Sequence, residues 1–145
     1  MAYTLQAIIT KSDALPTLPN KLQLVNLRGG MDLLPLGTEA LKAHSLSFCP
    51  LTDEGQENLP PGMVKLCEEL SAQCSLAYVE VELFGGAGTQ AHAIFSAGKQ
   101  VGPVVVSDSA VNQALRYLGF GKGEAFDEFE AVGLGKCRST DDWLE

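Results

Sequence analysis

Three consecutive segments with the character of β-strands occupy the middle of the chain and are separated only by tight turns. Residues 76–84 alternate side chains of two kinds, and residues 89–96 and 101–106 are rich in apolar and β-branched types. The breaks at 85–88 and 97–100 contain the glycines typical of turns. Because a tight turn joins neighbouring strands that run in opposite directions, this pattern predicts an antiparallel three-stranded meander.

Further strands are expected in the N-terminal third. Residues 2–10 combine β-branched and aromatic types and end at a polar Lys-Ser-Asp stretch, as a strand would. Residues 22–27 and 31–36 favour two short strands joined at a pair of glycines. Residues 46–49 fit either a short strand or an extended loop, because the following proline prevents a helix there.

Two main helices are expected, at residues 62–74 and 107–118. In the first, apolar side chains recur at helical spacing and form one stripe. The members of this stripe are Met63, Leu66, Cys67, Leu70 and Cys74. The second begins among serine and aspartate residues suited to capping and stops at Gly119. A short helix over 39–43 is also expected, with Thr38 as its cap.

These elements predict one domain of the α+β class that covers residues 1–145. We expect an antiparallel or mixed sheet of about five or six strands, with the two main helices packed on one face. A short helical C-terminal tail should follow. In this tail, Phe126 and Phe129 should press on the body, and Trp143 should anchor the end of the chain by burial.

Negative charge is concentrated in two parts of the chain. The net charge is −8, and residues 51–82 and 124–145 each hold seven acidic residues, against one and two basic residues. Such a charge disfavours binding to nucleic acids and to anionic membrane surfaces. It can serve solubility alone, or it can form a face for a basic protein partner. The residues expected at that face are Glu124, Asp127, Glu128, Asp141 and Asp142.

The leading functional expectation is a non-enzymatic, acidic protein-binding domain. No motif in the sequence is specific enough to fix a reaction, and the charge suits electrostatic complementarity with a basic partner. A bacterial immunity or inhibitor protein that neutralises a basic toxin or nuclease fits this description. No cofactor is expected, and the oligomeric state is left open.

A small-molecule-binding or enzymatic domain is the alternative. Its site would contain Glu80, Glu82 and His92, because a carboxylate can orient a histidine as a general base. Whether His92 shares a sheet face with the two glutamates depends on the length of the intervening turn. The glycine-rich turn itself is not expected to bind phosphate, since such loops lead from a strand into a helix.

The four cysteines are expected to be reduced thiols of a cytoplasmic protein. The sequence contains no secretory signal, no apolar run long enough for a membrane span and no paired Cys-x-x-Cys spacing. A metal site is therefore not expected. Cys67 and Cys74 should be buried by packing, whereas Cys137, between Lys136 and Arg138, is the more plausible reactive thiol.

Overall fold

The computed structural model describes residues 2–15, 18–19, 21–84 and 87–144. The strands are β1 (Ala2–Lys11), β2 (Val25–Asn26), β3 (Met31–Pro35), β4 (Ser75–Phe84), β5 (Ala87–Ser96) and β6 (Lys99–Ser107). The α-helices are α1 (Thr38–Ala43), α2 (Pro61–Leu70), α3 (Ala110–Tyr117) and α4 (Glu128–Val132). Two short 3-10 helices follow, η1 (Leu134–Lys136) and η2 (Asp141–Leu144).

The strands form one six-stranded sheet in the order β2-β3-β1-β4-β5-β6, and every neighbouring pair is antiparallel. The α+β class and the β4-β5-β6 meander are thereby confirmed. The N-terminal strand lies in the centre of the sheet, between β3 and β4. Residues 46–49 form no strand, so the extended-loop alternative holds for this segment.

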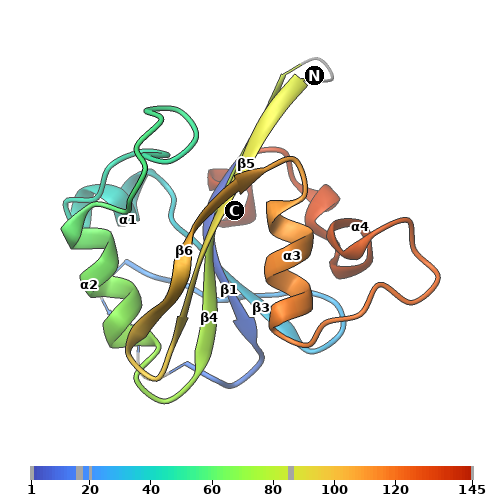
Figure 1. Cartoon of the computed structure of the whole chain (residues 1–145), viewed down its shortest axis with the longest axis horizontal. Coiled ribbons are helices and arrows are strands. Elements are labelled where there is room, and N and C mark those ends of the chain that lie inside the picture. Colours follow the sequence, from blue (N-terminus) through green and yellow to red (C-terminus); the bar gives the residue numbers. More distant parts are fainter. Residues whose placement is uncertain (1, 16–17, 20, 85–86, 145) are drawn as a thin grey trace.

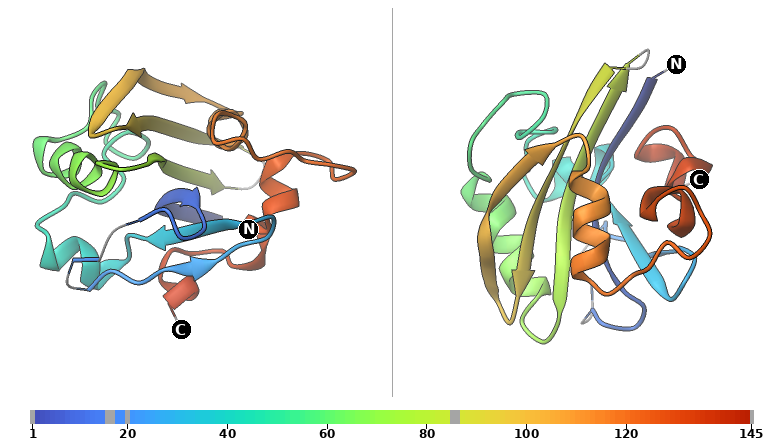
Figure 2. Two further views of the ribbon diagram at one scale, coloured as in Figure 1. Left: turned by 90° about the horizontal axis from the view of Figure 1, so that it is seen from below. Right: turned by 45° about the vertical axis from the view of Figure 1, so that its right-hand side comes forward.

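The two main helices lie on opposite faces of the sheet, so their expected placement on one face is wrong (Figure 1). On one face, α3 packs with Leu5 and Val79. On the other, α2 packs with Ile8 and Tyr78. The physical reason is that β1 and β4 carry buried side chains on both faces, and each apolar face of a sheet must be covered. The right-hand view of Figure 2 shows the sheet between the two helices.

Helix α2 is shorter than its apolar stripe predicted. It ends at Leu70, and the backbone N–H of Ser71 closes it by donating to the Cys67 carbonyl oxygen at 3.0 Å. Cys67 is fully buried within the core, as expected. Cys74 lies beyond the helix and is only half-buried, so the packing prediction holds completely for Cys67 and partly for Cys74.

The C-terminal segment runs back along β1. The Thr4 N–H donates to the Arg138 carbonyl oxygen at 2.9 Å, and the Gln6 N–H donates to Thr140 Oγ1 at 3.0 Å. Trp143 is buried, as its expected anchoring role requires. Within the described residues, no helix combines the length and the apolar character needed to cross a membrane.

Helix α1 takes its cap from this C-terminal segment. Gly37 occupies the N-cap position and has no side chain to contribute, so Thr38 is not the cap that the sequence suggested. Asp141 supplies the missing acceptors: the N–H of Thr38 donates to Asp141 Oδ1 at 2.9 Å and its hydroxyl donates to Oδ2 at 2.7 Å. A side chain distant in sequence thus satisfies an orphan donor of the first helical turn.

Candidate functional site

The structure does not bring Glu80, Glu82 and His92 together. In the β4–β5 ladder, His92 is opposite Val79 and Glu80 is opposite Ala91. Directly paired residues share a face and successive residues alternate, so His92 lies on the α3 face while both glutamates lie on the α2 face. The expected carboxylate–histidine pair is therefore not formed.

Glu80 is the acceptor at the centre of a buried polar cluster on the α2 face. Its carboxylate accepts the backbone N–H groups of Leu51, at 3.1 Å, and Thr52, at 2.9 Å. It also accepts the Tyr78 hydroxyl at 2.5 Å and the Thr52 hydroxyl at 2.9 Å. These contacts fasten the loop after Pro50 to the middle of the sheet.

Gln6 of the central strand extends this cluster. Its side-chain amide donates to the Tyr78 hydroxyl at 2.9 Å and to the Ser47 carbonyl oxygen at 3.0 Å. Its amide oxygen accepts the backbone N–H of Cys49 at 3.1 Å. Because each of these polar groups has a partner, the cluster can remain buried between the sheet and the 47–52 loop.

Glu80 has a shifted pKa. Burial raises the pKa of Glu80, although its hydrogen bonds oppose the shift. The Thr52 hydroxyl lies 2.9 Å from Glu80 Oε1 and 2.8 Å from Glu82 Oε1, yet a hydroxyl has only one proton to donate. The Thr52 hydroxyl can therefore donate to only one of the two glutamates at a time.

Cys49 borders the cluster but lacks the properties of a nucleophile. Its side chain is fully buried. Burial raises the pKa of the thiol, and the neighbouring charges of Glu80 and Glu82 raise it further. Reactive cysteines need the opposite environment, with partial exposure and nearby positive charge. We therefore assign a structural role to the Cys49 segment.

The edge of this cluster opens into a shallow pocket of about 280 Å³. Its walls include Asp53, Glu82 and the exposed ring of Phe84, together with Thr52 and Thr89. Gly88 lies at the same pocket, where an added Cβ would stand 2.5 Å from the Glu82 carbonyl oxygen. The lining thus contains two carboxylates and an aromatic ring, with no cationic side chain among the described lining residues.

Sequence reasoning found Glu82 but missed the other residues of this pocket. Asp53 and Thr52 reach it from the loop that Glu80 holds, about thirty positions away along the chain. Phe84 was correctly expected as the last residue of a strand, but the pattern did not indicate that its ring lines a pocket. The acidic composition of residues 51–82 was the one available signal, and it did not identify individual residues.

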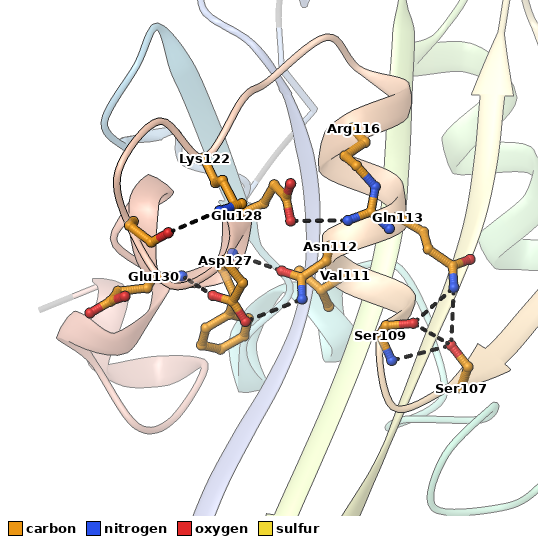
Figure 3. A network of polar contacts seen from close by, with 12 residues as sticks. Ser107, Ser109, Val111, Asn112, Gln113, Arg116, Lys122, Asp127, Glu128 and Glu130 are labelled. Carbon is orange, nitrogen blue, oxygen red and sulfur yellow. Dashed lines mark hydrogen bonds and ion pairs between the residues drawn. The ribbon is translucent and has the colours of Figure 1, made fainter.

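Most of the acidic residues expected at a C-terminal binding face have partners within the fold (Figure 3). Asp127 caps α4 by accepting the Glu130 N–H at 2.9 Å, and it also accepts the Asn112 side-chain amide at 3.2 Å. Glu128 is buried and pairs with Arg116 at 3.1 Å. Asp141 caps α1, as described above.

The tail therefore differs from the expected arrangement of three exposed carboxylates and two docked phenylalanines. Glu124 is exposed, but Glu128 is buried. Phe129 packs against the core, whereas Phe126 is 86% exposed. The reason is that α4 begins only at Glu128, so residues 124–127 do not follow helical spacing. Asp142 is exposed, and Cys137 is half-buried against the core.

His92 lies on the α3 face, away from both glutamates. Its side chain is buried, and its Nδ1 atom has no hydrogen-bond partner among the described residues. Burial lowers the pKa of His92 from its ordinary value of 6.5, and a hydrogen bond with Gln113 partly opposes this effect. The unfolded chain therefore takes up a proton near pH 6.5 that the folded chain binds only at a lower pH.

Replacing His92 with leucine should remove a pH-dependent loss of stability. The contribution of a histidine with a lowered pKa is fully present above about pH 6.5 and is lost as the pH falls toward the folded-state value. Wild type should lose stability relative to His92→Leu by up to about 1.4 kcal/mol per pH unit in that range. Urea unfolding across about pH 5 to 8 measures this difference. Parallel stability curves for the two proteins would contradict the assignment.

Within the described ranges, no three His, Cys, Asp or Glu side chains gather in a way that could hold a metal ion. A scan against protein-family models, a search of curated proteins and a search of solved structures each gave no match to this chain. The geometry and charge of the molecule itself are therefore the basis for assigning a function.

Proposed function

We propose that this chain is a non-enzymatic domain that binds a basic protein, and that the pocket formed by Asp53, Glu82 and Phe84 receives a lysine or arginine side chain of that partner. The main support for this proposal is the lining of the pocket, in which two carboxylates lie beside an exposed aromatic ring. A cation gains from both, through an ion pair and through the negative face of the ring.

Two features support a binding role for this pocket. Glu82 is held in place by the Thr52 hydroxyl at 2.8 Å, so a partner does not have to order this carboxylate on binding. The net charge of −8 adds long-range attraction for a basic protein, which raises the association rate at low salt. An inhibitor or immunity protein that neutralises a basic toxin or nuclease is the class of protein that fits best.

A small-molecule site is the second candidate, because the volume of about 280 Å³ approaches that of small-ligand pockets. Its ligand would be a small organic cation, and the site would contain Glu82 without His92. Titration with free arginine amide distinguishes the two candidates. Saturable binding of this compound as tight as that of a basic protein would favour the small-molecule site.

The test neutralises the pocket and compares it with an equal change of charge elsewhere. The pocket variant is Asp53→Asn with Glu82→Gln, and the matched control is Glu68→Gln with Glu69→Gln on the exposed side of α2. A basic protein captured from the source cells is titrated against wild type and both variants at two salt concentrations. We expect the pocket variant to lose about tenfold or more in affinity, and the control much less.

Three results would contradict the proposal. Equal losses in the pocket variant and the control would show that only net charge matters. Unchanged affinity in a folded pocket variant would exclude this pocket from the interface. Affinity that does not fall with added salt would also contradict an interface based on opposite charges.

A further inference from the structure

A second pocket, of about 330 Å³, has the opposite electrostatic character. It lies between the turn after β2, the C-terminal end of α4 and the two 3-10 helices. Its polar lining consists of Asn26, Arg28, Lys136 and Trp143. In a chain with a net charge of −8, this lining contains two cationic side chains and no described carboxylate.

The two cations are not used for ion pairs within the described part of the chain, where Arg116 and Glu128 form the salt bridge. Arg28 is nevertheless fixed at its backbone, because its N–H donates to the Val132 carbonyl oxygen at 3.1 Å. Its side chain passes over Gly133, with Nε 3.6 Å from the position that a Cβ on this glycine would take. Gly133 has a left-handed φ of 92° at the end of α4, a conformation that favours glycine.

Trp143 adds an independent observation. The residue lines this pocket, and its indole Nε1 is buried without a hydrogen-bond partner among the described residues. An indole nitrogen can only donate, and a buried indole N–H usually has an acceptor. Because Nε1 is closed off from solvent, Trp143 contributes ring surface to the pocket, and the exposed Arg28 and Lys136 supply its charged donors.

We infer that this pocket binds a small organic anion through a carboxylate or phosphate group. Arg28 supplies the planar pair of donors that suits either group, and Lys136 adds a second positive charge. The ring of Trp143 forms a wall of the pocket beside these two cations. The volume of about 330 Å³ lies within the range of small-molecule sites and exceeds the need of a single inorganic ion. The inference is independent of the proposed basic partner, which uses a different pocket.

Trp143 is the one tryptophan in the sequence, so its signals report directly on this pocket. The probes are citrate, glucose 6-phosphate and inorganic phosphate, each compared with sodium chloride at equal ionic strength. Binding should give a saturable change in tryptophan emission and move the single indole N–H resonance. A response to citrate alone identifies a carboxylate ligand, and a response to glucose 6-phosphate alone identifies a phosphate ester.

Variants separate a defined site from general attraction of anions. Arg28→Gln and Lys136→Gln should each weaken binding about tenfold or more, whereas Lys99→Gln, at the exposed first residue of β6, should have little effect. Trp143→Phe keeps an aromatic wall, so calorimetry should show that this variant still binds the anion. The inference is overturned if no probe gives a saturable response, or if all three charge variants bind alike.

Discussion

Replacing Glu80 with leucine should lower the free energy of unfolding by about 3 kcal/mol or more. The carboxylate is the shared acceptor for the N–H groups of Leu51 and Thr52 and for the Tyr78 hydroxyl. Leucine has a similar volume but no acceptor, so all three buried donors lose their partner. Each such loss costs about 1–3 kcal/mol, which relaxation of the loop reduces only in part.

Urea unfolding of Glu80→Leu beside Glu69→Leu measures this effect. Glu69 is exposed on α2, so the same substitution there should change stability by less than about 0.5 kcal/mol. Glu80→Gln should fall between wild type and Glu80→Leu, because it keeps one acceptor oxygen. A loss of less than about 1 kcal/mol for Glu80→Leu would show that the loop is not held by this carboxylate.

The raised pKa of Glu80 gives its contribution a definite pH dependence. A carboxyl group with a raised pKa contributes stability that is fully present below its unfolded value of 4.5 and is lost as the pH rises through the folded-state pKa. The stability of wild type relative to Glu80→Gln should therefore decrease from acid toward neutral pH. This trend is opposite in sign to that of His92.

The second large effect is expected in the C-terminal acidic segment. Changing Asp127 and Glu128 together to lysine should lower the free energy of unfolding by about 3 kcal/mol. Asp127 loses its role as helix cap, which costs about 0.5–2 kcal/mol. A lysine in place of the buried Glu128 faces Arg116 with a like charge, although the exposure of Arg116 moderates the penalty.

Glu124→Lys combined with Asp142→Lys is the control for this second effect, because it produces the same change of net charge at two exposed positions. Its stability should stay within about 0.5 kcal/mol of wild type. Thermal or urea unfolding of both double variants checks the difference. Equal stability would mean that the contacts of Asp127 and Glu128 contribute nothing to folding. The control variant also tests the C-terminal face as a binding surface. If this folded variant no longer binds the partner, the exposed carboxylates of Glu124 and Asp142 belong to the interface.

Local patterns were sufficient to predict most of the elements, but they could not predict how these elements meet. The alternation over residues 76–84 identifies a strand, and the stripe through Met63 and Leu66 identifies a helix. Both patterns involve only residues that are close together in the sequence. The assignment of α2 and α3 to faces depends on contacts between distant parts of the chain. A central strand with both faces buried also lacks the alternation that would show which face needs a helix.

The candidate site depends even more strongly on distant contacts. Glu80 becomes a buried acceptor only because the 47–52 loop folds over it, and no local sequence pattern predicts that contact. The position of His92 was undecided because a change of one residue in register moves a side chain to the other face. The acidic tail was misjudged for a related reason, since residue type alone does not distinguish a capping aspartate from a free one.

The route of the C-terminal segment along β1 has a consequence for biosynthesis. Strand β1 leaves the ribosome well before Arg138 and Thr140, yet Thr4 and Gln6 bond to these two residues. The Tyr3 hydroxyl likewise cannot donate to the Leu134 carbonyl oxygen until Leu134 has been synthesised. During synthesis, the apolar strand at the centre of the future sheet therefore stays incompletely covered. Nascent chains of this protein should be clients of ribosome-associated chaperones until residue 140 has emerged.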